Sequence, residues 1–263
     1  MKKRPVIGVL RENKNKWEKR AVLTPNDVKW FVERGIEVEV ESSPIRVFKD
    51  AEYKKVGAKV VDKAQKASLL VGIKEPHLDD ILDDKIYMIF SHTSKGQSYN
   101  MPLLKEFLER DVTLVDYEKI TDITGRRLVC FGRFAGICGM VDSLYYYGKK
   151  LEWKGANNPF SKLKPAWKYH TLPEIKEDME RVRKRIQSKG LPRRIAPFMV
   201  GIIGHGHVSA GAQEIIDLLN PVEIRARHIY GIARNRNFAN NDVYKIVFLQ
   251  EEKVTNKKKK GFN

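Results

Sequence analysis

The sequence has few cysteines and lacks a long apolar run. The first feature argues against a disulfide-bonded or zinc-binding protein, and the second against a membrane-spanning one. Cys130 and Cys138 lie in a stretch predicted to be helical, too far apart along a helix axis for a disulfide, and no second cysteine pair completes a zinc site. No run approaches the roughly 18 apolar residues that a membrane-spanning helix needs. The start, "MKKRPVIGVLREN", has too short an apolar run for a signal peptide. We therefore expect a soluble protein of the reducing cytoplasm.

The charge is strongly positive. The chain has 263 residues, 42% of them hydrophobic, enough for two domains with buried cores, and its formal net charge is +17. Such a charge favours nucleic acid, phosphorylated cofactors or acidic metabolites as partners. The aromatic and basic residues are not interleaved as on RNA-binding sheets, which argues against nucleic acid. The final "NKKKKGFN" is typical of a disordered, solvated tail.

Short apolar runs alternate with helical patterns along the first 130 residues or so. Their length and β-branched content favour buried strands. The predicted strands span residues 6–10, 36–41, 58–61, 68–73, 85–91 and 112–116. Between them, "TPNDVKWFVERG", "DAEYKKVG" and "NMPLLKEFLERD" predict helices, the first with Thr24 as its N-cap, Pro25 at its first position and Gly35 after its end. This alternation predicts a doubly wound, mostly parallel sheet.

The pattern changes near Gly132. "GRFAGICGMVDSLYYYGKKL" predicts a helix with small residues on one face, as expected where a helix packs closely on another element. Residues 173–189 predict a charged helix with Ile175, Met179, Val182 and Ile186 as its apolar stripe. We therefore expect an α/β protein with two doubly wound, Rossmann-like domains: residues 1–131 for the substrate and catalysis, and residues 132–263 as a partial NAD(P)-binding domain.

Four basic side chains follow predicted strands of the first domain. Arg11, Lys74 and His92 come directly after strands, and Arg20 precedes the helix at Thr24. Ligands of doubly wound sheets sit outside the carboxyl ends of the strands. Guanidiniums bind carboxylates, and a crowded amine can exchange protons near neutral pH. Together these residues outline a site for an amino acid or keto acid. The alternative is that the lysine is a solvated loop residue and the histidine a hydrogen-bonded structural group.

The stretch "MVGIIGHGHVSAGAQEIIDLL" joins an apolar strand to an amphipathic helix beginning near Val208. Gly204 and Gly206 permit a tight turn and a close approach of the backbone to a pyrophosphate, with the helix N-terminus facing it. The third glycine is displaced to Gly211, and Ser209 stands where the simple pattern has its last glycine. The alternative is an ordinary strand-turn-helix without a ligand.

Several motifs together resemble one family. They are "LREN…WEKRAVLTP", "GIKEP", "FSHTSKGQSYNMPLL", "LVDYEKITDITGRRLVCFGRFAGICGM" and "GHGHVSAGAQEI". In this order they resemble the lysine-ketoglutarate reductase domain, the half of the aminoadipic semialdehyde synthases that makes saccharopine. The sequence is more distantly similar to saccharopine dehydrogenase, alanine dehydrogenase and the transhydrogenase N-terminal region. The resemblance implies the alanine-dehydrogenase type of fold.

The resemblance also implies roles for individual residues. Lys74 and His92 correspond to the acid/base pair, and Arg20 to the arginine that contacts a substrate carboxylate. Arg11, near the same segment, is a second candidate for substrate binding. The implied reaction joins the ε-amine of lysine to the ketone of 2-oxoglutarate, with hydride from NADPH, to give saccharopine. His207 stands where the family has asparagine.

The expected cofactor contacts extend beyond the glycine turn. Glu223 follows Gly204 at the spacing of the acid that binds ribose hydroxyls, and Arg225 and Arg227 suit a 2′-phosphate. This favours NADP(H) over NAD(H). The expected cofactor-binding residues are Gly204, Gly206, His207, Val208, Ser209, Gly211, Glu223 and Arg225.

In relatives the cofactor domain continues past a segment like "VYKIVFLQEEKVTNKKKKGFN", in which this sequence ends. We therefore expect an incomplete second domain with residues 243–250 as an exposed edge strand that pairs with another chain. The expected partners are a second copy of the chain or a separate C-terminal chain. The alternative function is a truncated remnant or subunit that binds ligand and needs such a partner for catalysis.

Overall fold

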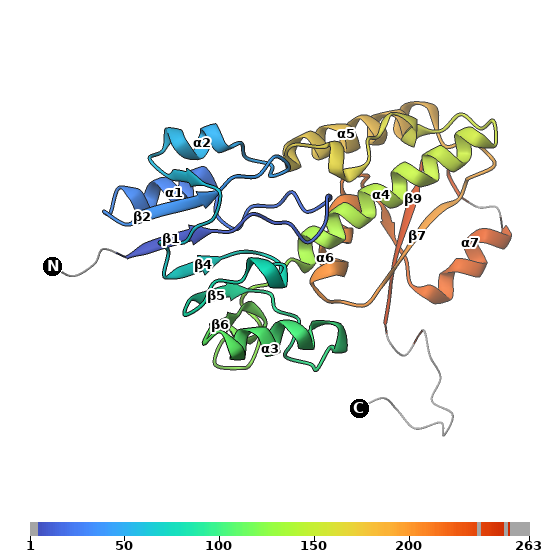
Figure 1. Ribbon diagram of the computed structural model, residues 1–263. Helices are drawn as coiled ribbons and strands as arrows, with labels where there is room; N and C mark the ends of the chain where they lie inside the picture. The colour runs from blue at the N-terminus through green and yellow to red at the C-terminus, as the bar shows by residue number, and fades with distance from the viewer. Residues whose placement is uncertain (1–4, 236–237, 250–251, 253–263) are drawn as a thin grey trace, which may run out of the picture. The chain divides into compact units, whose positions relative to one another are not determined.

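The structure is a computed structural model that describes residues 5–235, 238–249 and 252 (Figure 1). The chain divides into two compact units, residues 1–130 and residues 131–263. The tail expected to be disordered, residues 256–263, lies outside the described residues.

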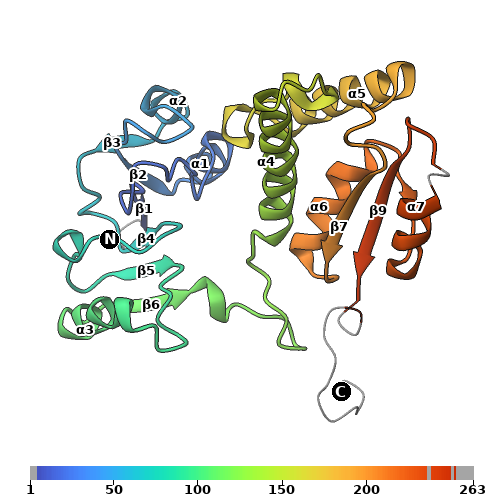
Figure 2. The same ribbon diagram turned by 90° about the vertical axis from the view of Figure 1, so that its right-hand side faces the viewer.

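The first unit is built on a six-stranded parallel sheet with the order β3-β2-β1-β4-β5-β6 (Figure 2). Its strands are β1 (Val6–Val9), β2 (Glu37–Glu41), β3 (Lys59–Val61), β4 (Leu69–Val71), β5 (Ile86–Ile89) and β6 (Thr113–Asp116). Each predicted strand is present. The strand order reverses between β1 and β4, and the crevice at such a reversal is where doubly wound sheets bind ligands.

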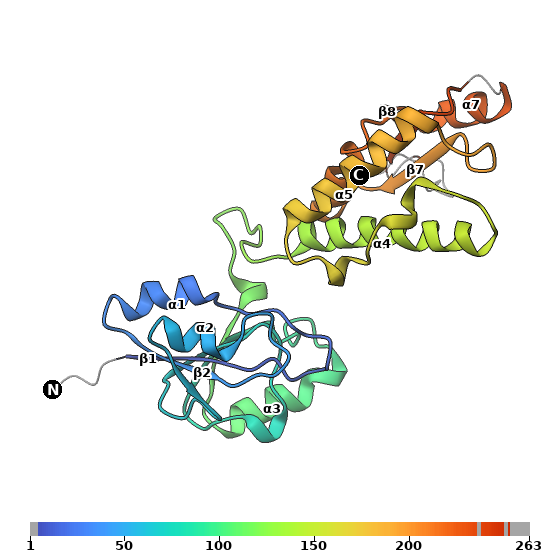
Figure 3. The same cartoon turned by 90° about the horizontal axis from the view of Figure 1, so that it is seen from above.

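Helices cover both faces of this sheet (Figure 3). They are α1 (Pro25–Val32), α2 (Asp50–Lys55) and α3 (Met101–Glu109). Val28 of α1 and Tyr53 of α2 belong to one buried cluster with Val9, whereas Leu103 and Phe107 of α3 belong to another. Because side chains of a strand alternate between its faces, the strands supply both clusters. The doubly wound prediction is confirmed.

The start of α1 shows how local sequence fixes an element. The Thr24 hydroxyl accepts a hydrogen bond from the Asp27 amide at 3.3 Å, and the Asp27 carboxylate accepts one from the Thr24 amide at 2.7 Å. Pro25 occupies the first helical turn, where no amide donor is needed. Gly35, with φ of +76°, follows the helix end. The predicted start and stop signals are confirmed.

The second unit holds a three-stranded parallel sheet with the order β7-β9-β8. Its strands are β7 (Phe198–Ile203), β8 (Val222–Glu223) and β9 (Val243–Phe248). The prediction of an edge strand at residues 243–250 is wrong, because β9 lies in the middle and pairs on both sides. The apolar sequence of β9 correctly indicated a buried strand. Burial of both faces of a strand does not indicate whether the strand has one neighbour or two.

The helices of the second unit are α4 (Gly132–Trp153), α5 (Leu172–Lys189), α6 (His207–Asp217) and α7 (Ile229–Asn235). Figure 2 shows α6 and α7 on opposite sides of the sheet. The predicted stripe of α5 is confirmed, since its four apolar residues are buried.

Cys130 was expected inside a helix but precedes α4, and it and Cys138 are free, exposed thiols. Short 3₁₀ turns occur at Leu78–Asp80, Ser98–Asn100, Tyr117–Lys119, Pro159–Lys162, Ala166–Lys168 and Ala226–His228.

Helices α4 and α6 pack backbone against backbone through two glycines. A Cβ atom at Gly136 would overlap the carbonyl oxygen of Val208, and one at Gly211 would overlap the carbonyl oxygen of Arg133. The small-residue face predicted for α4 is therefore confirmed. Gly211 serves this helix contact, which explains why a glycine stands there whether or not a ligand binds.

We predict that Gly136→Ala destabilises the second unit by roughly 1–3 kcal/mol, because the new methyl group forces the helices apart. Gly139→Ala is the matched control on the same helix, since a Cβ there meets nothing within 4 Å. It should leave stability unchanged or raise it by up to about 1 kcal/mol, because alanine favours the helix. Urea unfolding followed by circular dichroism measures both. Equal stabilities of the two variants would contradict the close contact.

Candidate functional site

The candidate site of the first unit lies where β1, β4, β5 and β6 end side by side. Glu12 follows β1, and its carboxylate accepts hydrogen bonds from the backbone amides of Ile73 at 2.5 Å and Lys74 at 3.0 Å. Both amides belong to the segment leaving β4. A carboxylate from one strand exit therefore fixes the main chain of the next, at the point where the sheet order reverses.

Glu12 is 8% exposed, and its protonation differs from that of a solvated glutamate. Burial raises its pKa to about 6, although the amides of Ile73 and Lys74 oppose this shift. The negative charge of Glu18 raises the pKa further, and the positive charge of Arg20 lowers it. Sequence reasoning missed Glu12, although it stands next to Arg11 in the "LREN" motif.

Arg20 and Glu18 form a forked ion pair beside Glu12. Arg20 donates from Nε to Oε1 of Glu18 at 2.7 Å and from Nη2 to Oε2 at 2.6 Å. The hydrogen bond from Arg20 lowers the pKa of Glu18 in spite of burial, and the charge of Lys74 lowers it further. Lys74, Arg20, Glu18 and Glu12 therefore act on one another electrostatically.

His92 is held from two sides. Its Nδ1 lies 3.3 Å from Oε2 of Glu75, and its ring stacks on Phe90 with 6.4 Å between centroids. Its backbone is left-handed, with φ of +53°, an arrangement that is uncommon outside glycine and recurs at functional sites. Burial raises the pKa of Glu75, but hydrogen bonds from Lys14 and Asn100 outweigh it and the net shift is downward. Glu75 is thus an ionised carboxylate that orients the imidazole.

Lys74 differs from its basic neighbours. Arg20, Lys14 and His92 each face a carboxylate, whereas the Lys74 amine forms no salt bridge with the residues that the structure describes. Its main chain is fixed by Glu12, and its side chain is partly exposed. Because its main chain is fixed and its amine is not engaged in a salt bridge with the described residues, Lys74 is suited to exchange a proton with a ligand at this sheet edge.

Arg11 points to a different group of residues. Its Nη2 donates to the Asp62 carbonyl at 2.7 Å and to Oδ1 of Asp62 at 3.0 Å, and its amide donates to Glu41 at 3.0 Å. Glu41 is the last residue of β2, and Asp62 directly follows β3. The structure thus joins Lys74, His92 and Arg20 through acidic residues, and it engages the guanidinium of Arg11 elsewhere. Glu75, in "GIKEP", is a second acid that sequence reasoning missed; an acid beside the basic residue of a strand exit was the available signal.

The glycine turn of the second unit follows β7 directly. Gly204 has φ of +86°, Gly206 is the N-cap of α6, and a Cβ at either position would meet nothing within 4 Å. The first amides of a helix have no acceptor within it. The open backbone and these amides fit a phosphate or pyrophosphate group.

The other predicted cofactor residues lie in different surroundings. His207 and Val208 are exposed in the first turn of α6. Ser209 is buried, and its hydroxyl accepts a hydrogen bond from Gln213 at 3.1 Å. Glu223 binds the amine of Lys245 at 2.6 Å, whereas Arg225 is exposed at the start of a 3₁₀ turn.

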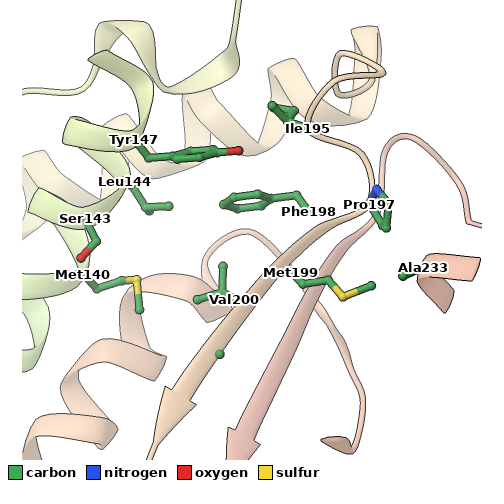
Figure 4. Close-up of a pocket in the computed structure, with 11 residues that line it drawn as sticks. Met140, Ser143, Leu144, Tyr147, Ile195, Pro197, Phe198, Met199, Val200 and Ala233 are labelled. Atoms are coloured by element: carbon green, nitrogen blue, oxygen red, sulfur yellow. The ribbon is translucent and has the colours of Figure 1, made fainter. Parts of the chain in front are cut away.

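An apolar cavity of about 610 Å³ lies beside β7 and α4 (Figure 4). It is lined by Met140, Ser143, Leu144, Tyr147, Ile195, Pro197, Phe198, Met199, Val200, Gly201 and Ala233. Tyr147 and Phe198 stack with 5.6 Å between ring centroids. No charged side chain is among these lining residues, so the cavity offers apolar contact and no anion site.

Within the described chain, no cluster of three or more His, Cys, Asp or Glu is placed to hold a metal ion.

Comparison with known proteins identifies the family. Residues 8–138 match the family described as alanine dehydrogenase/PNT, N-terminal domain. The chain belongs to this family. The solved structure of an L-alanine dehydrogenase shares its fold, with a TM-score of 0.56 at 20% identity, covering 94% of this chain and 62% of that one. The expected family and the expected α/β fold are confirmed.

Curated relatives are similar over most of this chain. An α-aminoadipic semialdehyde synthase of Arabidopsis thaliana is 40% identical over 81% of this chain, and the mitochondrial enzyme of Mus musculus is 34% identical over 89%. A saccharopine dehydrogenase [NAD(+), L-lysine-forming] of Neurospora crassa is 31% identical over 78%. The chain spans only 21%, 27% and 56% of these relatives, respectively.

No helix of the described residues is both long and apolar enough to cross a membrane.

We predict that Glu12 makes stability depend on pH. Its pKa is about 6 in the folded protein against 4.5 for an ordinary glutamate, so folding favours its protonated form. This contribution is complete below pH 4.5 and is lost as the pH rises through 6. Between about pH 4 and pH 7, the unfolding free energy of the wild type should fall by about 2 kcal/mol relative to that of Glu12→Gln.

Denaturant unfolding of both proteins across this pH range measures the difference. Glu37→Gln is the control, because the hydrogen bond from Lys59 lowers the pKa of Glu37. A carboxylate with a lowered pKa stabilises the folded protein at pH values above its pKa in the unfolded chain. The unfolding free energy of the wild type should therefore rise relative to that of Glu37→Gln as the pH rises. Parallel curves for wild type and Glu12→Gln would show that Glu12 titrates as it does in the unfolded chain.

Proposed function

We propose that this chain is an oxidoreductase of lysine metabolism that interconverts saccharopine with L-lysine and 2-oxoglutarate, using a nicotinamide cofactor. The observation that carries the proposal is the placement of two basic side chains, Lys74 and His92, at the exits of the neighbouring strands β4 and β5 of the first unit. The names of the relatives support the substrates, since they include saccharopine dehydrogenase and α-aminoadipic semialdehyde synthase.

The reaction begins when the lysine ε-amine attacks the ketone carbon of 2-oxoglutarate and forms a C–N bond. Loss of water then gives an imine, and reduction of its carbon gives the secondary amine. Lys74 and His92 transfer the protons of addition and water loss, and Glu75 holds the His92 ring in place. The nicotinamide cofactor supplies the hydride when it is bound.

The remaining charges position the substrates. Arg20 binds a substrate carboxylate, and Glu18 fixes the plane of its guanidinium. Arg11, the second candidate, stabilises the exit of β1 through Asp62 and Glu41. In the second unit, Gly204, Gly206 and the first amides of α6 hold the pyrophosphate of the dinucleotide. The preference for NADP(H), expected from Glu223, Arg225 and Arg227, stays a prediction, and the carboxylate of Glu223 binds the Lys245 amine at 2.6 Å.

The compartment and the assembly state stay predictions. A cytoplasmic location was expected, whereas the α-aminoadipic semialdehyde synthase of Mus musculus is named as a mitochondrial protein. A second copy of the chain or a separate C-terminal chain remains the expected macromolecular partner. The alternative of a ligand-binding subunit without its own catalysis is tested by the same assay as the enzyme.

We predict that Lys74→Met and His92→Gln each lower kcat by a factor of roughly 10² to 10⁴, the usual loss on removal of an acid/base group. The measurement follows NAD(P)H oxidation with L-lysine and 2-oxoglutarate, with and without a relative's C-terminal segment added. Lys105→Met, an exposed lysine on α3, is the control and should keep wild-type activity. Full activity of Lys74→Met would refute its role. Ligand binding without turnover by the wild type in either condition would favour the ligand-binding subunit.

A further inference from the structure

Asn100 contacts two of the segments that hold His92. Its Nδ2 donates to Oε1 of Glu75 at 3.1 Å and to the backbone carbonyl of Ser91 at 2.7 Å. Glu75 follows β4 and Ser91 follows β5, and Figure 2 shows these two strands side by side. Both partners are acceptors, so the amide nitrogen of Asn100, and not its oxygen, faces them. One buried amide, in a residue that is 7% exposed, therefore joins the exits of two neighbouring strands.

Ser91 and Thr93 fix the main chain on either side of His92. The buried Ser91 hydroxyl donates to Oδ2 of Asp116, the last residue of β6, at 2.6 Å. Because this bond uses its only hydrogen, the Ser91 oxygen accepts from the hydroxyl of Thr93 at 2.7 Å and from the amide of Thr93 at 3.2 Å. With the Ser91 carbonyl held by Asn100, the left-handed backbone of His92 is fixed from both sides.

The other contact of Asn100 acts through Glu75. Oε1 of Glu75 accepts hydrogen bonds from Asn100 and from the Lys14 amine, whereas its Oε2 lies 3.3 Å from Nδ1 of His92. Burial opposes ionisation of Glu75, but the hydrogen bonds from Lys14 and Asn100 bring its pKa below the usual value. An ionised carboxylate can only accept, so Nδ1 of His92 carries a hydrogen, and in the neutral ring Nε2 has the lone pair. Nε2 forms no hydrogen bond with the part of the chain that the structure describes.

We propose that Asn100 is a positioning residue that keeps the neutral His92 ring in the Nδ1–H tautomer, so that Nε2 is the atom that exchanges protons with the substrate. It acts through the Glu75 carboxylate and through the Ser91 carbonyl. The nitrogen of a histidine that carries the hydrogen is set by the hydrogen bond that the ring makes. The inference rests on the proposed function, in which His92 transfers protons, and it adds the atom that does so and the residue that orients it.

Nuclear magnetic resonance of the imidazole nitrogens of the full chain, at a pH where the ring is neutral, measures the tautomer without turnover. The His92 signals are those missing from His92→Gln. The wild type should show the Nδ1–H form. Asn100→Asp keeps the side-chain shape and removes both amide donors, and Asn100→Ala removes the side chain. Each should give a mixture of tautomers or a mainly Nε2–H ring.

Asn158→Ala is the matched control. Asn158 is 1% exposed in the second unit, and its Nδ2 donates to the carbonyl of Gly148 at 3.1 Å. The substitution therefore removes an equally buried amide that has no contact with Glu75 or Ser91. The His92 tautomer of this variant should equal that of the wild type.

The same assay of NAD(P)H oxidation separates positioning from a merely structural role. Asn100→Asp should lower kcat by a factor of roughly 10 to 10², the scale of loss when a reacting group is misplaced. The KM of both substrates should change little, because Asn100 acts on the proton-transfer group and does not bind substrate.

Three results would overturn the role of Asn100: a wild-type ring in the Nε2–H form, an unchanged tautomer in a folded Asn100 variant, or an unchanged kcat in a variant whose tautomer has changed. The first needs no variant, so the proposal can fail even where a substitution prevents folding. Absence of turnover by the wild type, with and without the added C-terminal segment, would instead overturn the proposed function. The tautomer measurement would then still decide whether Asn100 orients the ring.

Discussion

The bridge from the Glu12 carboxylate to the amides of Ile73 and Lys74 is the interaction on which the candidate site depends. It joins the exits of β1 and β4 where the sheet order reverses, just beyond the backbone hydrogen bond from the Leu10 amide to the Val71 carbonyl at 2.9 Å. Each charged hydrogen bond of this kind is worth about 1.5–3 kcal/mol, and the burial that raises the Glu12 pKa offsets part of the gain. The bridge fixes the Lys74 backbone and leaves its amine available.

The same sheet edge pairs its other charges locally. Arg20 forms a salt bridge with Glu18, and Glu75 binds both the Lys14 amine and Nδ1 of His92, so carboxylates lie beside these basic groups although the chain as a whole carries +17. A ligand arriving here meets the Lys74 amine, which forms no salt bridge with the described part of the chain, and carboxylates that orient the groups beside it. This arrangement favours proton exchange over general attraction of anions.

Much of the first unit was predictable because its signals are local. Apolar runs gave the strands, and Thr24 and Pro25 gave the start of α1. The basic residues near strand ends pointed to Lys74, His92 and Arg20, whose roles stay predictions. The acids Glu12 and Glu75 were not predictable in the same way, because their roles follow from which strands are neighbours. Sequence patterns indicate which residues are buried and whether apolar residues recur with the spacing of a helix or of a strand. Neither property gives the order of strands in a sheet. That is also why β9 was expected at an edge and Glu223 beside the glycine turn.

Lys245 is a buried cation in the middle strand of the second unit. It is 4% exposed in the middle strand, and a buried amine needs compensating carboxylates. Asp217 at the end of α6 and Glu223 on β8 each lie 2.6 Å from it, and their hydrogen bonds keep its pKa raised against the opposing effect of burial. These two ion pairs connect β9 to α6 and to β8. The acid that spacing assigned to a cofactor is thus part of what holds the sheet together, and the exit of β9 is left beside the glycine turn.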